Sequence, residues 1–560
     1  MVRSQWDAGR FSQGLGAVAG VALLWGGVAP LPMQAQTASN PTLRIGIVQR
    51  FGRNDAKILV IEPVGGGDQL TVQFKTGDEL ETLTTGQVVL DTTPTPLDTT
   101  ALTERVVLST HRSFESAEDS ANQWRDNGIE TEIAQPDDWQ VWAKRDVYNT
   151  PLLRRLLLQD LQDAGYNVYV DSQVLQDLPK AAAIFNGFRY NRDVVSISTG
   201  AQRVRVIEKI GEVEETVRVY GGNLRLQPNA YGTYTLVNQV PIETYLRGVV
   251  PYEIGLAAPP TTIEAQAILA RTYVLRNLRR FVIDDYELCA DTQCQVYRGI
   301  TGAADVTDRA IATTQGLVLT YGNELVDALY SSNAGGVTAA FSHVWNGPDR
   351  PYLQPVIDSV VGSWDITARP LSDEANLKAF LALETGFNEE TWDTFRWSED
   401  ATLEKIGQDL KDYLQRRSHP LANFNEVQRL VVTERATSGR VQTLQLATDL
   451  GVVTLQKDEV IRAIEAPLSL LFHTAGLYEQ VPGEAQPQLV GYRFIGGGFG
   501  HGVGMSQTGA YNLGDLGWSS DRILKFYYPG TTLQPISDQL VYWQDPVNLN
   551  VPVSPAEATP

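Results

Sequence analysis

The sequence predicts a strand-rich α+β fold made of several domains. The chain has 560 residues, enough for about two to four domains. Short segments in which apolar and polar residues alternate recur along most of the chain, and such segments indicate strands. Few segments have helical spacing, and the clearest of these begins near Thr261. We therefore expect a strand-rich domain with one long helix at its groove, preceded by smaller modules.

The N-terminus has the three-part pattern of a secretory signal peptide. Arg3 and Arg10 precede an uncharged apolar run over residues 15–28, and small and polar residues follow. This run is short and rich in glycine and alanine, which is unusual for a membrane span. We assign residues 1–38 to a signal peptide, with an uncleaved anchor as the alternative. Either way the rest of the chain is expected to be exported, with no later transmembrane span.

Charge and cysteine content exclude several classes of function. The net charge is -21 and the acidic residues are widely spread, which argues against nucleic acid or anionic lipid as a partner. The two cysteines, Cys289 and Cys294, are too few for a disulfide-based scaffold. None of the five histidines stands in a His-Glu-x-x-His arrangement, the pattern of many zinc hydrolases.

Two modules are expected before the main domain. Residues 41–100 contain short strand-like runs around a turn at 65–68 and form a small β unit, and residues 92–96 have the composition of a linker. Residues 101–175 show the order strand, helix, strand, strand, helix, strand, with helices at 114–127 and 150–164. This is the order of a ferredoxin-like split unit.

The pattern of the second module resembles the SPOR domain, which binds wall glycan in bacterial envelope proteins. This resemblance depends on the order of elements rather than on a sequence motif. A ferredoxin-like spacer without a ligand is the alternative interpretation.

The main domain is expected over residues 190–535, with a helical and charged insertion at about 370–420 and a tail at 536–560. Two prolines precede its long helix, and Thr261 and Glu264 have the spacing of a capping box. The predicted apolar face contains Ile263, Ala267, Ala270, Val274, Leu278 and Phe281. Arg271 lies at the border of this face, where it either reaches water or pairs with a carboxylate or a substrate oxygen.

Four blocks of sequence in this domain resemble one protein family. They are Tyr245–Glu253 with Glu264–Val274, Cys289–Gly299, Val326–Thr338 with Val344–Trp345, and Gly498–Ala510 with Phe526–Gly530. Their order and content resemble the stage II sporulation protein D family, which includes amidase-enhancer proteins. Each block alone would be a weak signal, but four in the same order make a specific one.

The resemblance implies an enzyme that cuts cell-wall glycan. Enzymatic members of the family are lytic transglycosylases, which cleave after N-acetylmuramic acid, leave a 1,6-anhydro ring and prefer glycan without peptide stems. Their catalytic glutamate corresponds to Glu253. One carboxyl group suffices because muramic acid supplies its own nucleophile, the C6 hydroxyl, whereas ordinary glycosidases use two. Apolar neighbours in the sequence would bring the pKa of Glu253 near neutrality. An exposed loop glutamate is the alternative.

Further residues of these blocks are candidates for substrate binding. His501 lies in a loop with many glycines, which let backbone approach a ligand or other backbone, and a packed turn is the equal alternative. The candidate substrate-binding residues are Arg271, Tyr330, Ser332, Asn333, His501 and Gln507.

The cysteine pair raises the question of a metal. Some family members hold zinc with two cysteines and a preceding histidine, and Cys289 and Cys294 match these cysteines. No histidine occurs in residues 281–288, so a zinc site would be incomplete. We favour a disulfide or free thiols, and we expect no cofactor.

A second function also fits the resemblance. The protein would bind the wall without cutting it and stimulate a separate amidase. In both cases the expected partner is peptidoglycan, the expected location is the periplasm or cell envelope, and an amidase is a further partner.

Overall fold

The computed structural model describes residues 40–54, 56–211, 213–417, 419–480 and 486–544. The expected signal peptide and the end of the expected tail lie outside these residues. These described residues form one compact unit. Within the described ranges, no helix is both long and apolar enough to cross a membrane.

The first large sheet joins strands from both ends of the N-terminal half. Its strand order is β15-β1-β14-β13-β10-β3-β4. In it, β1 pairs antiparallel with β14, and β3 pairs antiparallel with β10. Strands of the expected small β unit therefore share a sheet with strands beyond residue 190. The strands are β1 (Thr42–Phe51), β3 (Leu70–Thr76), β4 (Glu79–Thr85), β10 (Val195–Thr199), β13 (Asn223–Pro228), β14 (Tyr234–Pro241) and β15 (Leu288–Cys289).

The second large sheet has the order β12-β11-β2-β5-β7-β6, and β8 pairs with both β5 and β9. Buried side chains of both sheets, among them Ile45, Val72 and Leu59, belong to one continuous core. Gly222, at φ +78°, separates β12 from β13. The strands are β2 (Lys57–Pro63), β5 (Val88–His111), β6 (Thr131–Ala134), β7 (Trp139–Ala143), β8 (Tyr169–Phe185), β9 (Phe188–Asn191), β11 (Arg203–Ile210) and β12 (Val213–Gly221).

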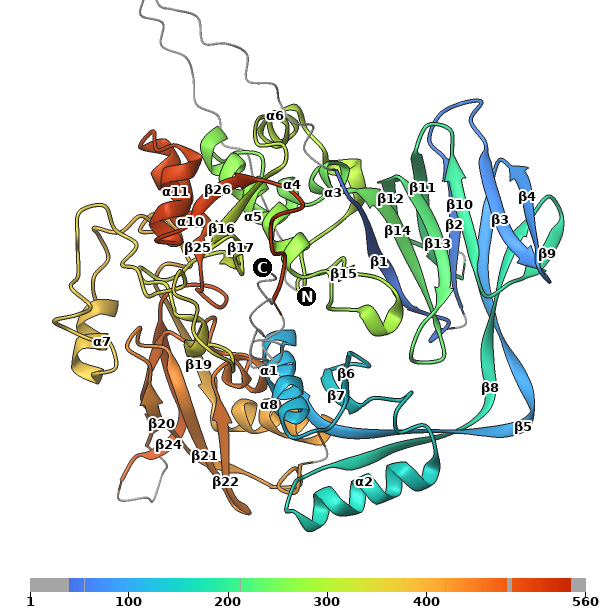
Figure 1. Ribbon diagram of the computed structural model, residues 1–560. Coiled ribbons are helices and arrows are strands. Elements are labelled where there is room, and N and C mark those ends of the chain that lie inside the picture. The colour runs from blue at the N-terminus through green and yellow to red at the C-terminus, as the bar shows by residue number, and fades with distance from the viewer. Residues whose placement is uncertain (1–39, 55, 212, 418, 481–485, 545–560) are drawn as a thin grey trace, which may run out of the picture. The chain divides into compact units, whose positions relative to one another are not determined.

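The expected linker at residues 92–96 is wrong, because these residues lie inside the 24-residue strand β5. β5 and β8 pair antiparallel from Val89 and Ile184 to Val107 and Tyr169, and they form the long two-stranded ribbon of Figure 1. Pro94 lies opposite Pro179 in this ribbon. Prolines are tolerated there because the outer edge of a two-stranded ribbon makes few ladder bonds.

The ribbon carries the elements predicted for the second module. Between β5 and β8 lie α1 (Phe114–Asp126), β6, β7 and α2 (Pro151–Asp163), so both predicted helices are confirmed. The strands follow the order β8-β5-β7-β6, and each neighbouring pair is antiparallel. The side chain of Ser113 accepts a hydrogen bond at the start of α1 and so fixes where this helix begins.

The long predicted helix exists as α5 (Pro260–Arg276), which follows α3 (Ile242–Leu246) and α4 (Val250–Glu253). The expected capping box is wrong: Pro260 occupies the first helical turn, Pro259 is the N-cap, and no side chain caps the helix. A single apolar face is also wrong, because every residue from Ala265 to Arg276 is buried. The reason is that α5 contacts α6, α10, α11 and β16 on several sides.

The expected helical insertion contains a strand. Helices α7 (Glu374–Leu381) and α8 (Leu403–Arg416) are separated by β19 (Trp397–Thr402), which joins β24 (Gln488–Gly496) and β23 (Phe472–Glu479) in one sheet. Another sheet contains β20 (Val427–Arg435), β21 (Val441–Thr448) and β22 (Gly451–Gln456).

The remaining elements are short. They are α6 (Asp305–Thr313), β16 (Leu317–Tyr321), β17 (Glu324–Leu325), β18 (Tyr330–Ser331), α9 (Glu459–Ala463), β25 (Met505–Ser506), α10 (Gln507–Asp515), α11 (Ser520–Tyr527) and β26 (Thr532–Pro535). The described start of the expected tail is held in place, because Ile536 N–H donates to the Gly316 carbonyl and Leu325 N–H donates to the Val541 carbonyl.

Candidate active site

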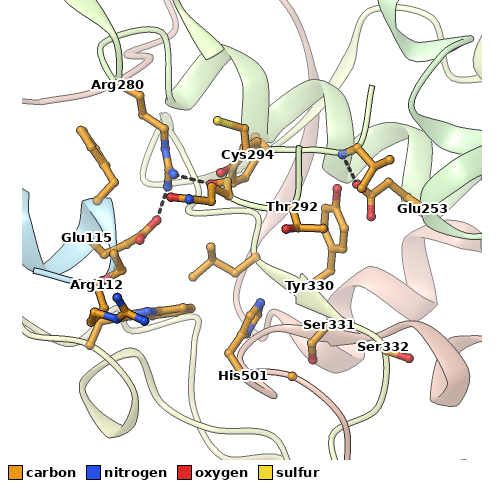
Figure 2. A pocket seen from close by; sticks show the side chains of 18 of the residues that line it. Arg112, Glu115, Glu253, Arg280, Thr292, Cys294, Tyr330, Ser331, Ser332 and His501 are labelled. Carbon is orange, nitrogen blue, oxygen red and sulfur yellow. Dashed lines mark hydrogen bonds and ion pairs between the residues drawn. The ribbon is translucent and has the colours of Figure 1, made fainter. Parts of the chain in front are cut away.

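One pocket brings the four sequence blocks together. Its volume is about 390 Å³, and Figure 2 shows its lining residues. The blocks contribute Glu253, then Thr292, Gln293, Cys294 and Val296, then Leu329, Tyr330, Ser331, Ser332 and Trp345, then Phe499, Gly500, His501 and Gln507. Glu253 and Gln507, which are 254 positions apart in the sequence, thus lie in one site.

Glu253 lies at the C-terminal end of α4 and is half-buried. Its Oε1 accepts a hydrogen bond of 2.7 Å from the backbone N–H of Val296. Burial raises the pKa of Glu253 to about 7, while the hydrogen bonds from Val296, Tyr330 and Gln507 act to lower it. Burial dominates because a charged carboxylate loses water that the hydrogen bonds only partly replace. At neutral pH this carboxyl group is about half protonated, as an acid and base requires.

Tyr330 belongs to a buried polar chain beside Glu253. Gln295 Nε2 donates to the Tyr330 hydroxyl at 3.1 Å, and the Tyr245 hydroxyl donates to Gln295 Oε1 at 3.1 Å. Burial, followed by the nearby Glu253 charge, raises the pKa of Tyr330 well above its usual range. Tyr330 therefore keeps its proton and remains a hydrogen-bond donor next to Glu253.

Gln507 positions the main chain that carries Glu253. Its Nε2 donates to the Glu253 carbonyl at 3.0 Å and to Gln266 Oε1, in α5, at 3.2 Å. Ser332 also lines the pocket, and its carbonyl accepts the N–H of Thr508 at 3.0 Å. Both predicted residues are thus at the pocket, and their contacts join the third and fourth blocks to the first.

His501 both faces the pocket and takes part in a packed turn, the two roles considered for the glycine-rich loop. Its ring lines the pocket and packs on Trp345 at 5.0 Å between centroids, while its Nδ1 accepts the Val503 N–H at 3.0 Å. Burial lowers the pKa of His501 to about 4, so the ring is neutral at neutral pH. In the same loop a Cβ at Gly504 would lie 2.0 Å from the Leu329 carbonyl oxygen, so there backbone approaches backbone.

Two of the predicted substrate-binding residues are not among the residues that line this pocket. Arg271 is fully buried, and its Nε and Nη2 donate to the two carboxylate oxygens of Glu243 at 2.8 and 2.7 Å. Asn333 is 1% exposed, and its Nδ2 donates to Thr508 Oγ1 at 2.9 Å. Arg271 thus joins α5 to α3, and Asn333 joins the third block to the fourth.

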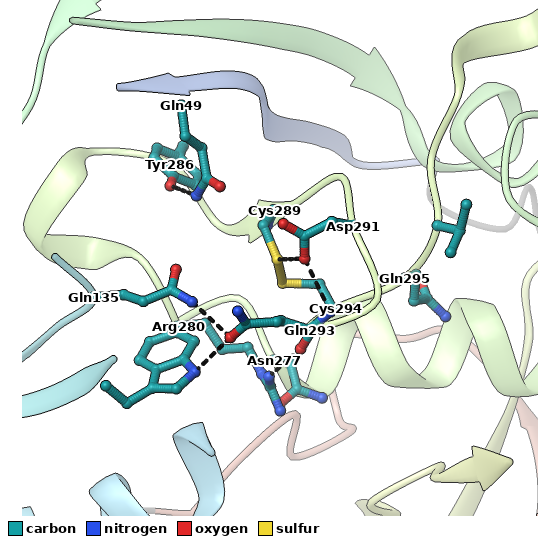
Figure 3. Close-up of a disulfide and its surroundings, with 12 residues drawn as sticks. Gln49, Gln135, Asn277, Arg280, Tyr286, Cys289, Asp291, Gln293, Cys294 and Gln295 are labelled. Carbon is teal, nitrogen blue, oxygen red and sulfur yellow. Dashed lines mark hydrogen bonds between the residues drawn. A yellow bond between two sulfur atoms is a disulfide. The ribbon is translucent and has the colours of Figure 1, made fainter. Parts of the chain in front are cut away.

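Cys289 and Cys294 form a disulfide, one of the two arrangements favoured from the sequence. The residues here do not fit a zinc ion, because no group of three or more His, Cys, Asp or Glu within the described ranges could hold a metal. Figure 3 shows the disulfide segment. Its Gln293 side chain accepts the Gln135 Nε2 at 2.6 Å, and its Gln293 carbonyl accepts Arg280 Nη1 at 2.9 Å. This segment leads directly to Val296, which holds Glu253.

A further part of the wall comes from the module carried by the ribbon, which sequence reasoning did not connect with the site. Its contributions are Arg112, Ser113, Phe114, Glu115 and Trp139. Glu115 forms an ion pair with Arg280, and Glu118 accepts Arg279 Nη2 at 2.7 Å. Nothing in the local pattern around residue 112 indicates this role, because the contact depends on long-range packing of α1.

A buried glutamate outside the predicted set fixes two of the blocks to each other. Glu389 is fully buried, its Oε1 accepts the Ala334 N–H at 2.6 Å, and the Ser506 hydroxyl donates to the same oxygen. Burial raises the pKa of Glu389. This residue lies in the expected insertion, 55 positions from Ala334 and 117 positions from Ser506, so no spacing rule could have found it.

Comparison with known proteins supports the family. Residues 230–321 match the family described as "Stage II sporulation protein", and residues 339–504 match a domain of unknown function. The chain is 28% identical over 360 residues to the "Amidase enhancer" of Bacillus subtilis, a match that covers 57% of this chain and 48% of that protein. The chain therefore spans about half the length of this relative.

Two further relatives are matched over most of their length. The "Stage II sporulation protein D" of Bacillus subtilis is 27% identical over 330 residues, which cover 55% of this chain and 80% of that protein. An uncharacterized protein of Brachyspira hyodysenteriae is 23% identical over 373 residues, 66% of this chain and 86% of that protein. With four motif blocks around one pocket, the chain is thus similar to stage II sporulation protein D and amidase-enhancer proteins, and residues 230–321 match the model of that family.

Proposed function

We propose that this protein is an exported lytic transglycosylase that cleaves the glycan strand of peptidoglycan, with Glu253 as its general acid and base. The observation that carries the proposal is the state of Glu253: it faces the pocket and its pKa is raised to about 7. Glu115 is the other acidic residue among those that line the pocket, and it is paired with Arg280. The site thus offers one carboxyl group for proton transfer.

The proposed reaction needs only that carboxyl group. Protonated Glu253 gives its proton to the glycosidic oxygen as the bond between C1 of muramic acid and that oxygen breaks. The resulting carboxylate takes the proton from the C6 hydroxyl while O6 bonds to C1. The products are a 1,6-anhydro end and a free 4-hydroxyl, no water is consumed, and Glu253 returns to its protonated state. The Val296 N–H and the Tyr330 hydroxyl stabilise the intermediate carboxylate.

The second candidate is a wall-binding protein that stimulates a separate amidase. The similarity to a relative named "Amidase enhancer" over 360 residues supports it. In this case the same pocket binds glycan, and the protonation state of Glu253 has no role in turnover.

The N-terminal half completes the proposal. Residues 1–38 serve as the export signal, and the protein acts in the periplasm or cell envelope. The ribbon-borne module is ferredoxin-like and related to SPOR domains, and its strand order β8-β5-β7-β6 supports this. We also propose that the mature chain is divided into a small β unit, this module, the main domain and a tail.

The test is a digest of purified wall glycan, with and without peptide stems, analysed by mass spectrometry. We expect products that end in anhydro-muramic acid, and we expect Glu253→Gln to remove them. Glu399→Gln, which changes an exposed glutamate of β19, is the matched control and should cleave normally.

Other outcomes contradict the enzyme. Products with ordinary reducing ends would show hydrolysis by water instead of ring closure. No cleavage, together with glycan binding and faster turnover by an added amidase, would favour the enhancer.

A further inference from the structure

The wall of the pocket opposite Glu253 is rich in arginine. Arg112, Arg280 and Arg462 all line the pocket. In Figure 2, Arg112 lies at the far side of the pocket from Glu253, next to Glu115. A cluster of three arginines is unusual in a chain with a net charge of -21. We therefore asked which groups neutralise each of these arginines.

One of these arginines is neutralised inside the wall. Arg280 is 3% exposed and forms an ion pair with Glu115. Its Nη1 also donates to the Gln293 carbonyl at 2.9 Å. Arg280 therefore holds α1 against the disulfide segment and has little charge left for a ligand.

Arg112 is only partly neutralised. Its Nη1 donates to Asp138 Oδ1 at 2.6 Å, but its buried Nε has no hydrogen-bond partner among the described residues. Asp138 is shared, because Arg417 Nη2 lies 3.7 Å from its other oxygen. Burial lowers the pKa of Arg112, and the charges of Arg417 and Arg462 add to this effect.

Arg462 is the exposed cation of this wall. It lies in α9, and its side chain makes no hydrogen bond or ion pair with another of the described residues. Asp458 is the nearby acid that interacts with it, and burial raises the pKa of Asp458 to about 7. Asp458 is thus about half protonated at neutral pH and neutralises Arg462 incompletely.

We propose that Arg112 and Arg462 form an anion subsite that binds a carboxylate of the glycan at the end of the pocket opposite Glu253. This deepens the proposed function and rests on it. Two guanidinium groups that face one pocket suit a carboxylate, because each offers several N–H donors in a fixed plane. Neither residue belongs to the four family blocks.

The chemistry of wall glycan identifies the carboxylate. N-acetylmuramic acid has a lactyl ether whose acid is either free or joined to a peptide stem through an amide. The free acid is an anion at neutral pH, whereas the amide is neutral and bulky. The subsite therefore selects muramic acid without a stem, and it disfavours N-acetylglucosamine, which has no such group.

The experiment measures binding in the Glu253→Gln background, where the ligand is not cut. Three oligosaccharides of equal length serve as probes: stem-free wall glycan, the same glycan with its lactyl acids converted to methyl amides, and chitin. We expect the acid form to bind most tightly. Arg462→Gln should weaken binding of the acid form about tenfold and change the other two by less than about twofold. Arg112→Gln should act in the same direction.

Controls separate a subsite from a folding effect. Arg429→Gln changes an exposed arginine of β20 that does not line the pocket, and it should leave all three affinities unchanged. Unfolding temperatures of each variant show whether Arg112→Gln disturbs the fold.

Equal affinity for the acid and amide forms would overturn the subsite, and so would an equal loss for all probes on Arg462→Gln. Failure of the proposed function would give a different result, because the unsubstituted chain would then leave glycan uncut. Preferential binding of the free-acid glycan over the amide form would still test the role of the two arginines.

Discussion

At the scale of single residues, the site places Glu253 where its charge is poorly solvated. Burial raises its pKa to about 7 against three hydrogen bonds that act to lower it. The same environment that makes the carboxyl group a usable acid makes its ionised form unfavourable. Activity and stability should therefore both depend on the protonation of this residue.

The pH dependence of cleavage follows from this pKa. We expect kcat/KM on stem-free glycan to be constant below about pH 7 and to fall about tenfold per pH unit above it, because the reaction begins with protonated Glu253. Initial rates between pH 5 and 9 measure this. An activity that rises across this range would assign the limiting step to a base.

Replacing Glu253 should abolish cleavage but increase the free energy of unfolding at alkaline pH. The folded pKa of Glu253, about 7, lies above the ordinary value of 4.5. Its contribution to stability is thus complete below about pH 4.5 and is lost as the pH rises through 7.

Glu253→Gln should then match the original chain at pH 4 and be more stable at pH 8, by on the order of 2 kcal/mol. Urea unfolding at both values measures this. A similar gain in the exposed-site control Glu399→Gln would refute the explanation.

The family blocks located four residues that line the pocket together with Glu253. Tyr330, Ser332, His501 and Gln507 were found in this way. Arg271 does not line the pocket; of the roles that the sequence left open for it, pairing with a carboxylate is the one observed, with Glu243. A motif shows that a residue is needed but does not distinguish a ligand contact from a buried structural pair.

At the scale of elements, Arg271 fixes α5 to α3. It is 0% exposed, and it also donates to the Leu317 carbonyl at 3.0 Å, so it links α5 to both α3 and β16. A buried guanidinium that uses most of its donors cannot be replaced by a single ammonium group.

Arg271→Lys should therefore lower the free energy of unfolding by about 2 kcal/mol. Because Arg271 does not line the pocket, KM for glycan should stay within about twofold. Thermal unfolding and initial rates measure the two effects. A large rise in KM with unchanged stability would restore the substrate-binding role that the sequence suggested.

Helix α5 illustrates what periodicity can and cannot predict. Its existence and its start near Thr261 are confirmed, because two prolines limit where a helix can begin. Its one-sided apolar face is not, since small residues let neighbours pack on every side. How many sides of a helix are covered depends on segments such as α10 and α11, more than 200 residues away.

At the scale of the whole molecule, the ribbon-borne module forms part of the pocket. Two ion pairs join it to the segment after α5: Arg280 with Glu115 and Arg279 with Glu118. The first guanidinium is 3% exposed and the second 19% exposed. Loss of a partner should cost more where the remaining charge is better buried.

Glu115→Gln should thus destabilise the protein by about 3 kcal/mol, and Glu118→Gln by about 1 kcal/mol. Urea unfolding measures both, and limited proteolysis shows whether the ribbon becomes accessible first. Equal costs would mean that the module is held by apolar packing around Phe114 and Trp139 instead.

The order of elements in the module was predictable from local pattern, but its place in the molecule was not. The pairing of β5 with β8 joins residues about 95 positions apart at its start, and alternation within one strand does not specify its partner. The proline-containing stretch at 92–96 has the composition of a linker, and only its cross-strand neighbours make it a strand.

The paired strands β5 and β8 also have a thermodynamic consequence. Both ends of the module are tied to the main sheet at adjacent positions, so docking of α1 is an intramolecular event. Tethering of this kind corresponds to an effective concentration in the millimolar range for short connections. Contacts that would be too weak to hold two separate proteins together are then sufficient to keep this wall of the pocket closed. The module can therefore acquire substitutions at its docking surface and still remain in place.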